Sequence, residues 1–272
     1  MNTNSNTYTV IYSTILVVVV AAVLAFAATA LKGKQEENVK VDTISQILTA
    51  AGLKYNEGDV LQVYKDNIKE AILVNAEGAE VGTLNTESIE SIQVYGNSEL
   101  KAQMAADQKS LPVYIFNNGV TVVPCYGAGL WGPIWGYIGI QGDLTITKAC
   151  FGHKGETPGL GAKITDMPEV FADKFTGKTI TAEILVAKNV TGENDVNAIS
   201  GATITSTAAG VMVNQWLGFY KGYFGEAQPC CGDCQTECCG DACCAETEQC
   251  CEECCEAAEE AAEEVVVEES NN

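Results

Sequence analysis

The sequence predicts an α+β protein, in which an N-terminal transmembrane helix is followed by a mixed, largely antiparallel sheet with flanking helices and then by a disordered tail. Three observations lead to this prediction. Residues 10–31 form an uncharged apolar run, residues 71–187 alternate short β-type runs with turns, and the composition changes abruptly to Cys and Glu after residue 228. We expect an anchor at 1–34, an N-terminal α/β part at 35–110, a second folded part at 111–227, and the tail at 228–272.

The run from Val10 to Leu31 contains 22 residues without a charge. At about 1.5 Å per residue, a helix of this length crosses the roughly 30 Å of bilayer hydrocarbon. A cleaved signal peptide is the alternative, because Ala28-Thr29-Ala30 has the small-x-small form of a cleavage site. The run is longer than the usual apolar region of a signal peptide, however, and no Lys or Arg precedes it. The sequence therefore predicts an uncleaved, single-pass anchor.

The charges after this run bear on its orientation. Lys32, Lys34 and Lys40 follow it, and the positive-inside rule would place the folded region in the cytoplasm. Glu36 and Glu37 lie among these lysines and weaken the asymmetry. The charge pattern alone therefore leaves the side of the membrane open.

Periodicity predicts the order of helices and strands in the folded region. Apolar residues recur at helical spacing before Gly52, which is suited to end a helix, at Val39, Ile44, Ile47, Leu48 and Ala51. Further helices are expected at residues 57–71, from Pro168 to Phe175, and from Ser206 to Phe219. Strands are expected at residues 71–75, 80–84, 91–95, 111–116, 120–126, 135–139, 143–150 and 179–187. Asn117-Asn118-Gly119 predicts a hairpin turn between two of them.

Composition excludes several classes of function. The formal net charge is −21, and fourteen acidic residues lie between Asp233 and Glu269. This acidic balance argues against nucleic acid as a partner, because phosphate backbones require basic patches. All 15 basic residues are lysines, so a bound phosphate must be held by N–H groups, hydroxyls, Lys or a covalent bond rather than by an Arg fork. His153 is the one histidine, which excludes metal sites built from several histidines.

Two glycine-rich segments could approach a ligand closely. Residues 127–136, G-A-G-L-W-G-P-I-W-G, suggest an aromatic wall beside exposed backbone or, alternatively, a turn whose tryptophans fill the core. Residues 153–161, H-K-G-E-T-P-G-L-G, form a constrained loop rich in N–H donors that suits a polar ring edge or a phosphate. Within this loop His153 is either a proton donor or a structural residue, and Glu156 is either a ligand contact or a turn residue.

A third segment, residues 197–206, places small residues and hydroxyls at the entrance of the predicted closing helix. N–H groups at a helix N-terminus favour a phosphate, so the Thr203 hydroxyl stands where it would meet one. The alternative is that Thr203 is an ordinary helix cap.

In this order the three segments resemble the FMN-binding domain family that includes the NqrC subunit of Na+-translocating NADH:quinone reductases and the RnfG subunit of Rnf electron-transport complexes. The S-G-A-T run that ends at Thr203 is similar to the family's flavinylation motif, and E-T-P-G-L-G at 156–161 matches its flavin-contacting loop. G-L-W-G-P-I at 129–134, and K-Q-E-E-N after the anchor, resemble the NqrC branch. The resemblance covers residues from about 10 to 225. One departure is Asn197, where the family usually has Asp.

The resemblance implies that a separate flavin transferase esterifies the phosphate of FMN to Thr203, and that residues 111–227 are the FMN-binding domain. It implies no catalytic residue and no bound metal. The further residues expected to bind the flavin are Ser200, Gly201, Ala202, Glu156, Thr157, Leu160, Gly161, Leu130 and Trp131.

As a function, the resemblance implies an electron-transfer subunit of a complex that couples oxidation of NADH by ubiquinone to sodium export. The isolated chain is then expected to be inactive without the other subunits. The resemblance places the flavin domain on the extracytoplasmic side of the inner membrane, against the weak lysine asymmetry. Two alternatives remain. One is an RnfG-type subunit, and the other is a non-catalytic, membrane-anchored metal-binding protein whose three segments are structural turns.

The tail holds eleven of the 13 cysteines, between Cys230 and Cys255. Thiolates among carboxylates could bind soft metal ions, and in an oxidising compartment they could form disulfides. The third possibility is a disordered acidic appendage. Cys125 and Cys150 belong to the folded region, where burial as free thiols is expected.

Overall fold

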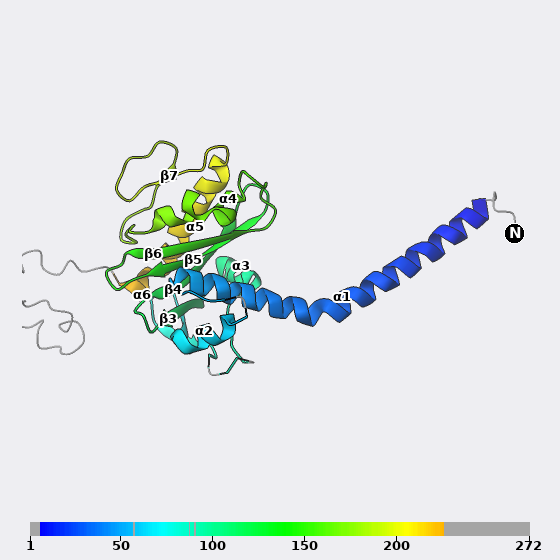
Figure 1. Ribbon diagram of the computed structural model, residues 1–272, viewed down its shortest axis with the longest axis horizontal. Helices are drawn as coiled ribbons and strands as arrows, with labels where there is room; N and C mark the ends of the chain where they lie inside the picture. Colours follow the sequence, from blue (N-terminus) through cyan, green and yellow to red (C-terminus); the bar gives the residue numbers. More distant parts are fainter. Residues whose placement is uncertain (1–5, 57, 87, 90, 226–272) are drawn as a thin grey trace, which may run out of the picture. The chain divides into compact units, whose positions relative to one another are not determined.

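The computed structural model describes residues 6–56, 58–86, 88–89 and 91–225, and Figure 1 shows their arrangement. A six-stranded antiparallel sheet, in the order β2-β1-β3-β4-β5-β6, has helices on both faces, which confirms the predicted α+β class. The predicted disordered tail lies outside the described residues. The elements are α1 (Asn6–Ala50), α2 (Val60–Asn67), β1 (Ile68–Val74), β2 (Glu80–Thr83), α3 (Asn97–Ala105), β3 (Leu111–Phe116), β4 (Thr121–Ala128), β5 (Pro133–Ile140), β6 (Ile146–His153), α4 (Lys163–Asp166), η1 (Pro168–Val170), η2 (Ala172–Phe175), β7 (Val186–Ala187), β8 (Val196–Asn197), α5 (Thr203–Phe219) and α6 (Lys221–Phe224).

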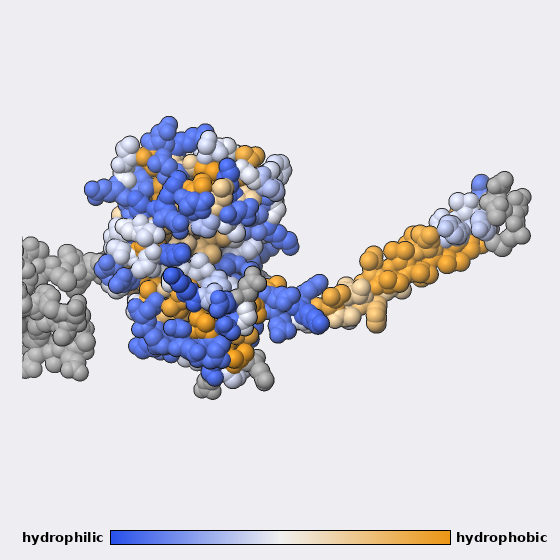
Figure 2. All heavy atoms as spheres, viewed as in Figure 1, coloured by the Kyte–Doolittle hydropathy of each residue, from blue (hydrophilic) through white to orange (hydrophobic). Residues whose placement is uncertain are grey.

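Helix α1 carries the predicted anchor and the predicted amphipathic helix without a break. The lysines, glutamine and glutamates between the two are good helix formers, so the helix continues through residues 32–38. The large apolar side chains between Val10 and Leu31 are exposed, and Figure 2 shows them as a hydrophobic stretch followed by a hydrophilic one. These 22 residues rise about 33 Å as a helix, enough to cross a bilayer. Among the described residues, α1 is the one helix that is long and apolar enough to do so.

The C-terminal end of α1 packs with α2 on one face of the sheet. Ile44, Ile47 and Leu48 are fully buried there, in a core that includes Tyr114 and Tyr137 from the strands. Helix α1 ends before Gly52, which has a φ of 73°, so the predicted stop at this glycine is confirmed. The anchor helix and the folded region therefore share one hydrophobic core.

Helix α5 covers the opposite face of the sheet. Trp216 and Met212 are buried against strand residues such as Val123 and Ile138. The Trp216 indole N–H donates to the Tyr126 carbonyl oxygen at 2.7 Å, which ties α5 to β4. Along β1 and β3 to β6, buried side chains divide between the two cores, because successive residues of a strand point to opposite faces. These contacts fix α5 against the sheet.

The hairpin between β3 and β4 forms where Asn117-Asn118-Gly119 predicts it. Gly119 has a φ of 81°, and its N–H donates to the Phe116 carbonyl oxygen at 3.1 Å. The Phe116 N–H in turn donates to the Val120 carbonyl oxygen at 3.0 Å. A glycine accepts this positive φ without steric cost, so the local sequence was sufficient to place the turn.

Helix α2 is shorter than predicted, because residues 68–71 belong to β1 instead. Ile68 pairs with Phe116 of β3, and the sheet gives the backbone its partners there. Strand β1 thus joins residues before position 110 to strands after it in one sheet. The proposed boundary between 110 and 111 stays a prediction.

Two further differences concern helices. Helix α3 was not predicted from the sequence, and the helix expected from Pro168 consists of the 3-10 helices η1 and η2.

Two predicted strands are wrong, and side chains explain both. Residues 91–95 form no strand, and the Tyr95 N–H donates to the Tyr114 hydroxyl at 3.0 Å. Of residues 179–187 only β7 is a strand. In that segment the N–H groups of Thr179 and Ile184 donate to side-chain oxygens of Asn194 and Asn214, at 2.8 and 3.0 Å. Residues 143–145 likewise lie outside β6, which begins at residue 146.

Candidate functional site

The three segments singled out in the sequence meet beside the beginning of α5, and Glu156 connects them. Its Oε1 atom accepts a hydrogen bond from the Trp131 backbone N–H at 2.9 Å. Its Oε2 atom accepts one from the Thr205 hydroxyl at 2.8 Å. The Glu156 side chain is only 4 % exposed, so its carboxylate is turned toward the protein interior. Glu156 therefore joins the loop between β4 and β5, the loop after β6 and the first turn of α5 through hydrogen bonds.

Two glycines of these segments leave room for that carboxylate. A Cβ atom added at Gly129 would lie 2.5 Å from Glu156 Oε1. A Cβ atom added at Gly161 would collide with Glu156 Oε2 and would lie 3.0 Å from the Thr205 hydroxyl oxygen. These contacts are far shorter than a side chain permits, so close approach to Glu156 explains why both positions are glycine.

The turn before α5 fixes where Thr203 lies. Gly201 has a φ of 82°, and Ala202 is the N-cap residue of the helix. Ser206 holds this turn from inside, because its hydroxyl donates to the Ala202 carbonyl oxygen at 2.9 Å and accepts from the Ile199 N–H at 3.0 Å. Thr203 is the first helical residue, and the N-cap position before it is held by Ala202, which makes no side-chain capping hydrogen bond. The interpretation of Thr203 as a helix cap is therefore wrong.

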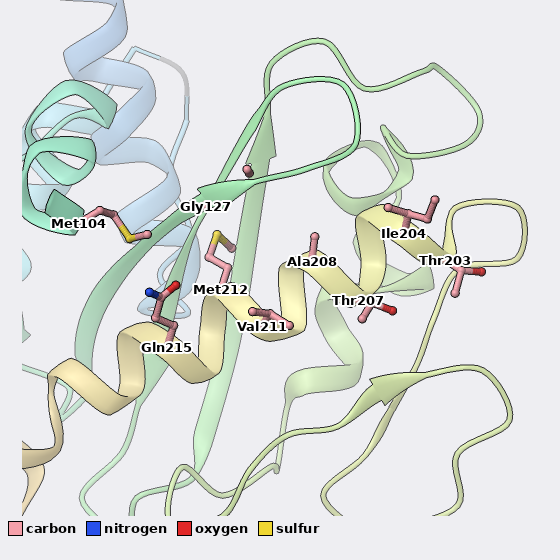
Figure 3. A pocket seen from close by; sticks show the side chains of 10 residues that line it. Met104, Gly127, Thr203, Ile204, Thr207, Ala208, Val211, Met212 and Gln215 are labelled. Carbon is pink, nitrogen blue, oxygen red and sulfur yellow. The ribbon is translucent and has the colours of Figure 1, made fainter.

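A cavity of about 610 Å³ opens along α5 from Thr203, and Figure 3 shows the side chains around it. Thr203, Thr207 and Val211 follow one another at four-residue spacing and lie on the same side of the helix. The lining residues are Met104, Gly127, Ala128, Thr203, Ile204, Thr207, Ala208, Val211, Met212 and Gln215. None of them is charged. The cavity suits a ligand with a large apolar part.

Exposed apolar side chains also belong to the three segments. Leu130 is 47 % exposed, Trp131 is 68 % exposed and Leu160 is 45 % exposed. Leu160 lies beside the turn before α5, because its Cδ2 atom would be 3.1 Å from a Cβ atom added at Gly201. Large apolar side chains held at the surface near a cavity are typical of a binding site. The interpretation of the first segment as a core-filling turn therefore fails for Trp131, whereas Trp135 is partly buried against the core.

The remaining predicted residues lie in the same loops. The Thr157 carbonyl oxygen accepts the N–H groups of Leu160 and Ala162, at 3.1 and 3.2 Å, and so closes the second segment into a turn. Ser200 is exposed in the turn before α5. His153 is the last residue of β6, and its Nδ1 atom is buried without a hydrogen-bond partner among the described residues. Within the same part of the chain, no group of three or more His, Cys, Asp or Glu residues is arranged to hold a metal ion.

Of the predicted flavin-binding residues, Thr203 alone lines the cavity. Gly127, Ala128 and Ile204 also line it and belong to the segments singled out in the sequence, but they were not among the residues predicted to bind the flavin. The row from Thr203 through Thr207, Val211 and Gln215 could have been found from its four-residue helical spacing. Met104 could not, because α3 joins the cavity through the fold rather than through any local pattern. Thr205 was also missed, although it donates to Glu156.

Comparisons with known proteins agree with this geometry. The model of the FMN-binding domain family matches residues 129–218, which include all three segments from Gly129 onward. The NqrC subunit of the Na(+)-translocating NADH-quinone reductase from Pasteurella multocida is 30 % identical over 225 residues, which cover 74 % of this chain and 85 % of that protein. The same subunit from Neisseria meningitidis serogroup B is 28 % identical over 235 residues, covering 76 % and 90 %.

A solved structure is also similar. The crystal structure of the NqrC subunit of the Na(+)-translocating NADH-quinone reductase from Parabacteroides distasonis superposes with a TM-score of 0.61 and 34 % sequence identity. The superposition covers 71 % of this chain and 96 % of that one. The similarity therefore extends over nearly the whole length of the solved chain.

Proposed function

This chain belongs to the NqrC family of Na(+)-translocating NADH-quinone reductase subunits, and on that premise we propose that it is a membrane-anchored electron-transfer subunit carrying FMN as a phosphoester on Thr203. The complex in which it acts oxidises NADH, reduces a quinone and exports sodium. Its partners are the other subunits of that complex, and a flavin transferase attaches the FMN. When bound, FMN supplies the electron transfer itself, and the protein supplies position and electrostatics.

The observation that carries this proposal is the position of Thr203. Thr203 is the first residue of α5, directly after the N-cap residue Ala202, and it lines the cavity described above. The first N–H groups of a helix have no partner within the helix and lie at its positive end, so they stabilise a phosphate there. Thr203 thus combines a hydroxyl that can form the ester with backbone donors for the phosphate oxygens.

The residues around Thr203 fit the rest of the cofactor. The cavity volume of about 610 Å³ lies within the range of small-molecule sites. Its walls are largely apolar, with Met104, Ala208 and Met212 among them, as a flat aromatic ring system requires. No Lys lines the cavity, and the chain contains no Arg. A covalent ester removes the need for such a cation, because it holds the phosphate permanently.

The other predicted contacts complete the proposal. Leu160, Leu130 and Trp131 offer apolar surface at the edge of the site, and Thr157 closes the loop that carries Leu160. Ser200, Gly201 and Ala202 form the turn that brings Thr203 into position, and Gly161 leaves the clearance described above. The buried Glu156 carboxylate contributes by accepting hydrogen bonds from the Trp131 N–H and the Thr205 hydroxyl.

Mass spectrometry of the full chain, purified from host membranes that contain the transferase, tests the attachment. We expect a mass increase of one FMN on the peptide that contains Thr203, and its loss in Thr203→Ala. Thr207→Ala is the matched control, because Thr207 lines the same cavity one turn further along α5. It should keep the flavin. An unmodified Thr203 peptide from such cells would contradict the proposal.

We further propose that the flavin domain lies on the extracytoplasmic side of the inner membrane. Lys174 is exposed on η2 and reports on the side of the membrane. A membrane-impermeant amine reagent should label Lys174 in intact cells, whereas lysines of a cytosolic control protein should react only after permeabilisation. Labelling of Lys174 only after permeabilisation would place the domain in the cytoplasm.

The identity of the complex follows from the subunits that copurify. Solubilisation in mild detergent should yield this chain together with the subunits of a sodium-pumping NADH:quinone reductase. The Rnf-type alternative predicts the subunits of an Rnf complex instead. The metal-binding alternative depended on the cysteine-rich tail, which lies outside the described residues.

A further inference from the structure

We propose that Glu156 is a positioning residue, which joins the three segments of the site and holds them in place before any flavin is attached. This inference rests on the proposed function only in taking FMN as the ligand that the site binds. Its basis is the pair of hydrogen bonds from the Trp131 N–H and the Thr205 hydroxyl to the two carboxylate oxygens. The two donors lie 25 residues before and 49 residues after Glu156 in the sequence.

The environment of Glu156 is costly for a carboxylate. The residue is 4 % exposed, and it forms no ion pair within the described part of the chain. Burying a carboxylate requires compensating hydrogen bonds, and here each oxygen receives one. Removing the carboxylate would therefore release two donors from two different segments at once.

The carboxylate also has little freedom to take another orientation. Gly129 lies against Oε1 and Gly161 lies against Oε2, each so close that a Cβ atom would not fit. Glycines at these positions bring two backbone segments directly onto the carboxylate. Packed in this way, Glu156 fixes the loop that carries Trp131 relative to the loop that carries Leu160.

The first turn of α5 is consequently held from two sides. Ser206 ties it to Ile199 and Ala202 within its own segment. Thr205 ties it to Glu156 and hence to the other two segments. Thr203 lies two residues before Thr205, on the same helical turn. Glu156 therefore helps, through Thr205, to hold the Thr203 hydroxyl in the position where FMN would be attached.

Three variants separate this role from general stability. Glu156→Gln can keep both hydrogen bonds, because its oxygen accepts from Trp131 and its NH2 group donates to the Thr205 hydroxyl, which can also accept. Glu156→Ala loses both, and Thr205→Val loses one while keeping the shape of the residue. Tyr220→Phe is the control, since it removes a buried hydrogen bond to the Pro112 carbonyl oxygen at the opposite end of α5.

The experiment measures hydrogen exchange of the Trp131 amide in the flavin-free full chain, and flavin attachment in cells with the transferase. In Glu156→Ala the Trp131 amide should exchange at least about tenfold faster, because loss of a hydrogen bond to a charged group has roughly this effect on opening. Attachment should fall by a similar factor. Glu156→Gln should stay within about twofold of the unaltered chain in both measurements. Thr205→Val should lower attachment but leave the Trp131 amide protected.

Unchanged Trp131 exchange in Glu156→Ala would overturn the proposal, as would an equal loss of attachment in Tyr220→Phe. If Glu156→Ala does not fold, normal attachment in Thr205→Val would overturn it instead. Failure of the proposed function has a different signature, since Thr203 of the unaltered chain would then carry no flavin. The exchange of the Trp131 amide would still decide whether Glu156 positions the segments.

Discussion

The indole N–H of Trp135 on β5 donates to the side-chain oxygen of Gln46 on α1 at 2.8 Å, across 89 residues of sequence. Through this bond the helix that carries the predicted anchor is tied to the same sheet that positions the site. Gly139 on the same strand lies against the Ala50 carbonyl oxygen, where a Cβ atom would collide. The end of α1 is thus a structural part of the folded region.

Replacing Trp135 tests this connection. Trp135→Phe keeps an aromatic ring but removes the donor to Gln46, so we expect the free energy of unfolding to fall by about 0.5–1.5 kcal/mol. Denaturant unfolding of the detergent-solubilised chain measures it. Trp131→Phe is the matched control, because that indole is 68 % exposed and its loss should change stability by less than about 0.5 kcal/mol. Equal effects of the two variants would show that the Gln46 bond does not contribute.

Gly161 should tolerate no side chain. Gly161→Ala forces a Cβ atom onto the Glu156 carboxylate and toward the Thr205 hydroxyl, so we expect a loss of about 1–3 kcal/mol in the free energy of unfolding. Flavin attachment should fall with it. Gly142→Ala, where no atom lies within 4 Å of an added Cβ, should leave both unchanged. Thermal unfolding and in-gel flavin fluorescence report the two effects, and a stable, fully flavinylated Gly161→Ala would contradict the geometry.

Asn197 replaces the Asp that is usual in the family, and the structure gives it a role. Its Oδ1 atom accepts from the Val190 N–H, and its Nδ2 atom donates to the Val190 carbonyl oxygen, both at 3.2 Å. An aspartate cannot donate, so Asn197→Asp should lower the free energy of unfolding by about 0.5–1.5 kcal/mol. Asn189→Asp makes the same charge change at an exposed turn position beside Val190, where Asp accepts the φ of 55° as Asn does, and should have little effect.

The same pair of variants tests whether the Asp of the usual motif matters for flavin attachment here. We expect attachment in Asn197→Asp to match that of the unaltered chain, measured as the modified fraction of the Thr203 peptide. A marked increase would instead show that the carboxylate improves recognition by the transferase.

The Cys150 thiol should react slowly in the folded protein. Burial raises its pKa from 9.0 to about 12. Because the folded-state pKa lies above the unfolded one, the contribution to stability is fully present below pH 9.0 and is lost as pH rises through about 12. At pH 8 the thiolate fraction, and with it the rate of alkylation, should be at least about 100-fold lower than in urea-unfolded chain. Peptide mass spectrometry follows the Cys150 peptide, and equal rates in the two states would contradict burial.

Much of this protein could be predicted from local sequence, for local physical reasons. A membrane span depends on length and lack of charge, and residues 10–31 carry both within themselves. The turn at Gly119 depends on one residue that accepts a positive φ. The closing helix α5 and the three glycine- and hydroxyl-rich segments were likewise evident from short-range pattern.

Contacts between distant residues decided the rest. Residues 91–95 and 179–187 have strand-like sequences, but the Tyr114, Asn194 and Asn214 side chains take N–H groups there that a neighbouring strand would have bonded. Glu156 has the sequence context of a surface loop, yet the fold buries its carboxylate between two donors that no local pattern connects to it. A hydrogen bond requires its partner within about 3 Å. Which groups come that close is settled by the sheet that α1, α2 and α5 cover.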